Sequence, residues 1–159
     1  MGIFIQMEKE KKKPDNAMRR LARLAAVQGL YQIALSAEPA ETLICRFCDD
    51  PSVLLQEEQT IVAIDGELFG AIVAGVHKNQ SDLDGMIAGA LDPRFSTDRL
   101  ELLLKIILRA GAFELLHRPE TPEGVIVNDY VDVGHGFFNA KEPGLINGIL
   151  DRLAKKLRS

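Results

Sequence analysis

The sequence predicts an all-α protein of about seven helices arranged in two small helical bundles. Leu, Ala, Glu and Lys are plentiful, whereas β-branched residues are not concentrated into runs. Apolar residues recur at the three- and four-residue spacing of amphipathic helices. Residues 60–64 (TIVAI) have the pattern of a short strand, but no nearby segment offers a partner strand, and two strands alone are marginally stable.

The length and composition predict one globular domain. A chain of 159 residues that is 47% hydrophobic can bury an adequate core without disulfides or metals. We expect residues 1–15 to form a flexible basic leader and residues 16–159 to form a single domain. Its N-terminal sub-bundle is expected to cover about 16–92, and its C-terminal sub-bundle about 96–158.

Helix-capping residues and prolines divide the N-terminal half. Asp15 or Asn16 caps a first helix that runs to about Ser36. Pro39 then opens a second helix, which ends before Pro51.

The following residues, 51–65, have the least certain pattern and are interpreted as connecting structure. Apolar residues at helical spacing then predict a helix over 66–79. A further helix is expected over 81–91, with Ser81 or Asp82 as its cap.

Three helices are expected in the C-terminal half. Residues 96–118 carry a wide apolar stripe and predict the central helix of that half. The next helix is expected over 121–138, with Thr121 as its N-cap and Pro122 at its first position. The last helix, over 141–158, has basic residues in its final turns, which suits the helix dipole.

The charge distribution is uneven along the chain. Residues 1–23 hold seven basic and three acidic residues, whereas the rest holds 12 basic and 20 acidic residues. This asymmetry predicts a basic N-terminal region on an acidic body. Two interpretations remain open from charge alone: a solvated tail, or a surface for an anionic partner such as a nucleic acid.

The first helix separates its charges from its apolar residues. Arg19, Arg20 and Arg23 lie in its first turns, and the helix is almost wholly apolar after Arg23. We expect the later two-thirds to be buried and the three guanidinium groups to project from the bundle. Positive charge at a helix N-terminus opposes the macrodipole, and arginine makes bidentate contacts with phosphate. The pattern therefore favours an anion-binding role for these arginines.

Motifs for catalysis, cofactors or metals are missing. The sequence holds no GxxxxGK[ST], GxSxG or HExxH motif, and its three histidines lie far apart. Cys45 and Cys48 form a CxxC, but without a βαβ context or two further ligands they are interpreted as buried or half-buried free thiols. No segment approaches the roughly 20 apolar residues of a membrane span. We expect a cytoplasmic protein that is not an enzyme and carries no cofactor.

Five segments carry a resemblance to a known family: "RRLARLAAVQGLYQ", "ELFGAIVAGVHKNQSDLDGMI", "LLKIILRAGAFELL", "TPEGVIVNDYVDV" and "FFNAKEPGLINGILDRLAKKL". Through these segments, which span about residues 17–155, the chain resembles the NusB family of bacterial transcription antitermination factors. The resemblance implies an all-helical fold of two bundles and no enzymatic activity. It also implies binding of boxA RNA together with NusE, a small-subunit ribosomal protein. With other Nus factors, this complex helps RNA polymerase to read through terminators in ribosomal RNA operons.

The resemblance also implies positions for the interface. The RNA-binding residues it indicates are Arg19, Arg20, Arg23, Gln28, Tyr31, Lys141 and Asn147. Lys105 and Arg109 on the long helix are expected to face the partner protein.

Some features at these positions depart from the family pattern or stay open. Leu145 stands where many relatives have phenylalanine, and the arginine cluster is sparser than usual, so Lys11, Lys12 and Lys13 are expected to assist it. Tyr31 fits either a core tyrosine or an RNA contact. The alternative function is a helical protein-interaction adaptor without RNA binding. A homodimer is also compatible with the sequence, and one that covered the arginines would be autoinhibited.

Overall fold

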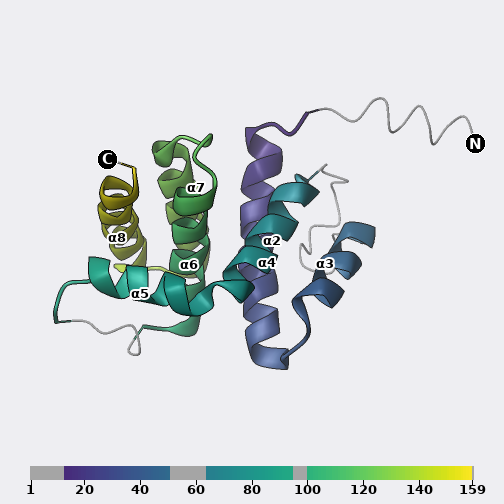
Figure 1. Cartoon of the computed structure of the whole chain (residues 1–159), viewed down its shortest axis with the longest axis horizontal. Coiled ribbons are helices and arrows are strands. Elements are labelled where there is room, and N and C mark those ends of the chain that lie inside the picture. The colour runs from purple at the N-terminus through teal and green to yellow at the C-terminus, as the bar shows by residue number, and fades with distance from the viewer. Residues whose placement is uncertain (1–12, 51–63, 95–99, 159) are drawn as a thin grey trace, which may run out of the picture.

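A computed structural model describes residues 13–50, 64–94 and 100–158, and these ranges form seven helices and no strand. The all-α prediction is confirmed. Figure 1 shows α2, α3 and α4 on one side of the molecule and α5, α6, α7 and α8 on the other. Leader residues 1–12, with Lys11 and Lys12, lie outside the described residues, as does most of the connecting segment 51–65. Within the described ranges no helix has both the length and the apolar character needed to cross a membrane.

Helix α2 (Asn16–Ser36) begins and ends where the sequence predicts. The Asp15 carboxylate caps it by accepting a hydrogen bond of 2.9 Å from the Met18 amide. At the other end, Ala37 takes a left-handed conformation (φ 58°) and donates its N–H to the carbonyl of Ile33. The expected burial holds for the middle of the helix but is wrong for its last turn, because Leu35 is 66% exposed.

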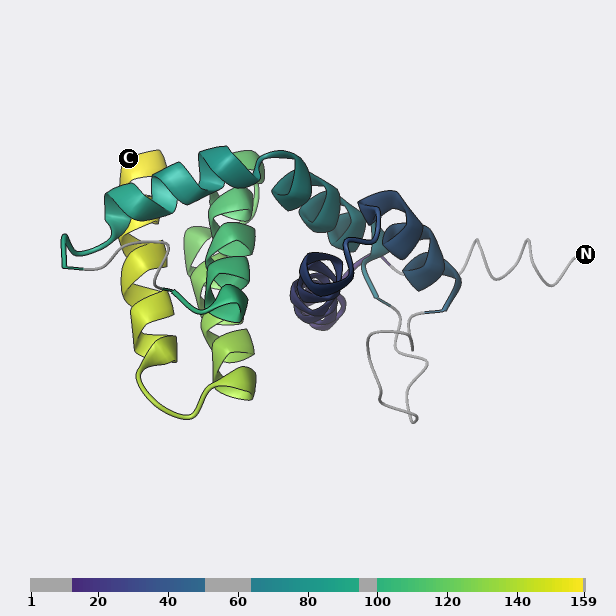
Figure 2. The same cartoon turned by 90° about the horizontal axis from the view of Figure 1, so that it is seen from below.

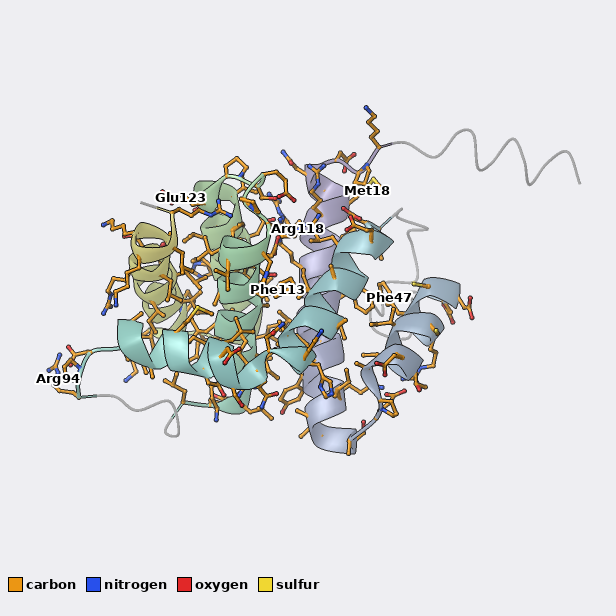
Figure 3. The ribbon with its side chains drawn as sticks, viewed as in Figure 1. Met18, Phe47, Arg94, Phe113, Arg118 and Glu123 are labelled. Atoms are coloured by element: carbon orange, nitrogen blue, oxygen red, sulfur yellow. The ribbon has the colours of Figure 1, made fainter. Side chains whose placement is uncertain are left out.

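Helices α3 (Ala40–Asp49) and α4 (Gly66–Lys78) pack against α2 and each other. Pro39 precedes α3 as predicted, and the rings of Phe47 and Phe69 stack with centroids 3.8 Å apart. Phe47 lies on the side of α3 that faces α4 (Figure 3). Cys45 and Cys48 are free but exposed, so the expectation that they are buried is wrong. The buried face of α3 is formed instead by Ala40, Leu43 and Phe47.

Helix α5 (Gln80–Ala90) begins slightly earlier than predicted, with Asn79 rather than Ser81 or Asp82 as its N-cap. It lies across α6 and α8 (Figure 2). Arg152 and Lys156 of α8 donate hydrogen bonds of 2.9 and 3.0 Å to the carbonyls of Ala90 and Gly89. We expect α5 to close the N-terminal sub-bundle. In the structure its C-terminal end is instead bound by α8, a helix of the C-terminal sub-bundle.

Helix α6 (Leu102–His117) is the central helix of the molecule. It contacts α2, α4, α5, α7 and α8, and every residue from Ile106 to Leu115 is buried. Helix α7 (Glu123–Phe137) follows, with Pro122 rather than Thr121 at its N-cap. Helix α8 (Glu142–Leu157) then packs against α5, α6 and α7. Helix α6 therefore provides most of the contact between the two groups of helices, to which α2 with α7 and α4 with α5 add smaller contacts.

Arg158, just after α8, donates hydrogen bonds to backbone carbonyls at the C-terminal end of α6. Its guanidinium donates hydrogen bonds to the carbonyls of Glu114, Leu115, Arg118 and Thr121. The carbonyls of Glu114 and Arg118 also accept backbone hydrogen bonds from Arg118 and Thr121, so this one side chain adds to the local bonds at the turn between α6 and α7.

A close approach between α4 and α6 depends on a glycine. A Cβ built on Gly75 would lie 2.1 Å from Cε1 and 2.4 Å from Cζ of Phe113. Phe113 is 7% exposed and lies where α6 faces α4 (Figure 3). Its ring also packs on His117, with ring centroids 4.8 Å apart, which limits how far it can move.

We expect Gly75→Ala to lower the free energy of unfolding by about 1–3 kcal/mol, because the Phe113 ring must leave its place. Gly85→Ala in α5 is the matched control, since a Cβ there meets nothing within 4 Å. That change should raise stability by about 0.5–1 kcal/mol through helix propensity. Urea denaturation followed by circular dichroism measures both, and equal effects would contradict the proposed packing.

Candidate nucleic-acid interface

The first turns of α2 present two exposed guanidinium groups. Arg20 has a side chain that is 61% exposed, and its nearest carboxylate oxygen, Asp129 Oδ1, is 3.6 Å from Nε. Arg19 is 41% exposed and lies 3.9 Å from the Oδ2 atom of Asp65. Both separations are at the long end of ion pairing, so both groups keep hydrogen-bond donors available to a ligand.

Arg23 does not belong to this exposed pair, and the prediction that its guanidinium projects is wrong. The residue is 1% exposed. Its Nε and Nη2 atoms donate to the two carboxylate oxygens of Glu114 at 2.7 and 2.9 Å, and Nη1 donates to Asp129 Oδ2 at 2.7 Å. Arg23 lies one turn beyond Arg19, on a stretch of α2 that α6 and α7 cover.

Tyr130 completes this buried network. Its hydroxyl donates a hydrogen bond of 2.6 Å to Glu114 Oε2. Burial raises the pKa of Tyr130 well above the usual value near 10, and the adjacent Glu114 carboxylate raises it further. Burial alone would lower the pKa of Arg23, but Glu114 and Asp129 raise it above the ordinary arginine value. Arg23 therefore stays charged and Tyr130 protonated inside the protein.

A groove separates α2 from α7 next to Arg20. It has a volume of about 360 Å³, and Arg20, Leu24 and Gln28 line it from α2. Gln28 is half-buried, and its Oε1 atom has no hydrogen-bond partner among the described residues. Tyr31, one turn further on, is 37% exposed, so of the two interpretations of this residue the surface position is the one observed.

The remaining predicted RNA contacts lie on another element. Lys141 and Asn147 are both exposed, before and within the first turns of α8, while Leu145 between them is half-buried. Helix α2 packs against α7, whereas α8 packs against α5, α6 and α7. The fold thus joins Arg19, Arg20, Gln28 and Tyr31 on one helix and places Lys141 and Asn147 across α7 from them.

The two predicted partner-facing residues differ in exposure. Arg109 is 6% exposed and donates to both carboxylate oxygens of Asp84, at 2.7 and 3.0 Å. The expectation that Arg109 faces a partner is therefore wrong, because its guanidinium ties α6 to α5. Lys105, in the first turn of α6, is half-buried.

Sequence reasoning missed the acidic residues that neutralise the buried arginines. Glu114 is the one acidic residue in the apolar run from Ile106 to Leu116, and such an isolated charge seldom survives burial without a partner. That signal was available in the sequence. The pairing of Glu114 with Arg23 was not, because 91 positions separate them.

Comparison with known proteins shows extensive similarity. The family model described as "NusB family" matches residues 20–155. The transcription antitermination protein NusB of Gluconobacter oxydans (strain 621H) is 38% identical over 146 residues, which cover 90% of each chain. That of Sinorhizobium fredii (strain NBRC 101917 / NGR234) is 41% identical over 142 residues, or 88% of each chain.

Two solved structures share the fold. NusB of T. maritima superposes with a TM-score of 0.68 at 25% identity and covers 94% of this chain and 96% of its own. A structure of antitermination factors NusB and NusE in complex with double-stranded RNA gives a TM-score of 0.69 at 23% identity. That match covers 86% of this chain and 96% of the other.

We expect Arg23→Met to lower the free energy of unfolding by about 3–5 kcal/mol, because it leaves Glu114 and Asp129 buried without a counter-charge. Arg20→Met, which removes an exposed charge from the same helix, should change stability by no more than about 0.5 kcal/mol. Urea denaturation compares the two variants. A small effect of Arg23→Met would show that the network does not stabilise the fold.

Stability should also decrease in alkali because of Tyr130. Folding raises its pKa, so its contribution is complete below the usual tyrosine value near 10 and is lost as the pH rises above it. In a Tyr31→Phe variant, Tyr130 is the sole tyrosine of the chain. Absorbance at 295 nm should then report ionisation only together with the loss of helical circular dichroism. Ionisation of Tyr130 in a fully helical protein would contradict the buried position.

Proposed function

Because this chain belongs to the NusB family, we propose that it is an RNA-binding transcription antitermination factor that acts without catalysis. Its curated relatives carry the name transcription antitermination protein NusB at about 40% identity over most of their length. A solved NusB of the same fold binds NusE and RNA. We propose that this chain likewise binds boxA RNA with NusE, and that with other Nus factors it helps RNA polymerase to read through ribosomal RNA operons.

The exposed pair Arg19 and Arg20 is the observation that supports RNA binding. The protein has a formal net charge of −4, yet the first turn of α2 contains no acidic residue. Cations at this end of a helix oppose the macrodipole, so the pair does not stabilise the helix on which it lies. Planar guanidinium groups suit bidentate contacts with phosphate oxygens.

Other residues extend this surface in the proposal. Lys13 is exposed three residues before the helix, and with Lys11 and Lys12 it would add diffuse attraction for a polyanion. Tyr31 would stack on a splayed base, as single-stranded RNA allows. Lys141 and Asn147 would provide a second set of contacts across α7. Lys105 remains our proposed contact with the partner protein.

We expect the double variant Arg19→Glu/Arg20→Glu to bind single-stranded boxA RNA at least tenfold more weakly than the wild type. It should also show a shallower dependence of affinity on salt, since each lost phosphate contact reduces that slope by about one. Fluorescence anisotropy with a labelled RNA, with and without NusE, measures both quantities.

The matched control is Lys78→Glu/Lys155→Glu, which changes the net charge equally at two exposed sites on α4 and α8. It should lose less than about threefold in affinity, because only general charge repulsion remains. Equal losses in the two double variants would refute the assignment of the site. Binding of NusE without any binding of RNA would identify the protein as an adaptor.

A further inference from the structure

We propose that the groove between α2 and α7 binds one unpaired guanine base of the RNA. The proposal rests on the proposed function, because it assigns base recognition to a cavity beside the phosphate-binding arginines. The volume of about 360 Å³ lies at the lower end of the roughly 300–1,000 Å³ typical of small-molecule sites. The groove is thus sized for one planar group rather than for a folded partner.

The groove is continuous with the exposed arginines. Arg20 lines its rim, and Arg19 is the preceding residue of the same helix. A phosphate held by these two guanidinium groups would place the attached nucleotide beside the opening. Asp129, which also lines the groove, is already neutralised by Arg23 at 2.7 Å.

The walls of the groove suit the faces of a base. Leu21 and Leu24 contribute from α2, and Val133 and Phe137 contribute from α7. Phe137 is 37% exposed, so part of its ring is available for stacking. Stacking on aromatic side chains is the common way in which proteins hold single-stranded bases.

The polar atoms that line the groove favour a ligand that carries hydrogen-bond donors. Gln28 Oε1 is buried and has no partner among the described residues, and an unsatisfied acceptor of this kind destabilises a protein until a donor reaches it. Asp132 adds an exposed carboxylate with no ion pair in the described part of the chain. Of the polar groups in the groove that are not already paired, the Asp132 carboxylate is an acceptor only, so at this position the groove disfavours a phosphate and favours a group with N–H donors.

Guanine is the base whose edge matches this requirement. Its N1–H and N2–H₂ groups are adjacent donors, so one carboxylate can accept from both. Adenine and cytosine each place a ring acceptor beside their amino group, and that acceptor would face the Asp132 carboxylate. Uracil has a single N–H between two carbonyl oxygens. Asp132 is therefore the specificity-determining residue of this proposal.

Gly136 provides a way to fill the groove without disturbing the helix. It lines the groove one turn after Asp132, and a Cβ built on it meets nothing within 4 Å. Gly136→Leu should therefore fold and occupy the space of the base. Gly124→Leu is the matched control, because Gly124 is equally open on α7 but does not line the groove.

The test measures the affinity of the full chain for labelled single-stranded oligouridylate RNAs that contain one central guanosine, inosine or adenosine. The wild type should bind the guanosine RNA at least about fivefold more tightly than the other two. Gly136→Leu should abolish this preference and retain weaker, salt-sensitive binding, while Gly124→Leu keeps the preference. Asp132→Asn should also lose it, whereas Glu123→Gln, the same charge change on an exposed α7 residue outside the groove, should not.

The outcomes separate the two proposals. Failure of the wild type to bind any of these RNAs, while it still binds boxA RNA with NusE, would overturn the guanine site alone, and failure to bind boxA RNA as well would overturn both. Binding that depends on Arg19 and Arg20 but ignores the central base would overturn the guanine site alone. A guanine preference that persists in both Gly136→Leu and Asp132→Asn would also overturn the guanine site. Circular dichroism verifies that each variant is folded. If Gly136→Leu does not fold, the base preference of Asp132→Asn alone tests the guanine site.

Discussion

The buried guanidinium of Arg23 is the interaction on which the arrangement of the helices depends. It joins α2 to α6 through Glu114 and to α7 through Asp129, at distances of 2.7–2.9 Å. Removing such charges from water costs several kcal/mol per ion, so the network is favourable only while every member is in place. This requirement fixes both the rotation of α2 and its distance from the C-terminal helices, which apolar contacts alone specify less strictly.

The same network divides the arginines of α2 between two roles. Asp129 accepts a hydrogen bond from Arg23 through Oδ2 and lies 3.6 Å from Arg20 through Oδ1. One carboxylate therefore anchors the buried arginine and lies close to the exposed one. The surface that carries Arg19 and Arg20 is held in place by the contact that holds the two groups of helices together. A rigid scaffold of this kind would reduce the entropy that the protein loses in the RNA binding that we propose.

Local signals in the sequence predicted most of the helices, whereas they could not predict which residues pair when they lie far apart in the sequence. Asp15 and Pro39 determine helix starts through neighbouring backbone groups, so they could be identified from a few residues. Arg23 and Arg109 could not be placed correctly, because their carboxylate partners lie 91 and 25 positions away. The exposed Arg19 and Arg20 were identified from charge pattern. The groove was not, since it requires the register of α2 against α7.

The hydrogen bonds of Arg158 have a consequence for the order in which the protein is made. The carbonyl of Arg118, which follows α6, receives this guanidinium from a residue 40 positions later. At about 5–20 residues per second, a ribosome takes roughly 2–8 s to synthesise that interval. During this time the central helix is complete in sequence, but the carbonyl of Leu115 still lacks the donor that Arg158 provides. The hydrogen bonds at the end of α6 are therefore completed only after the last turn of α8 has been synthesised.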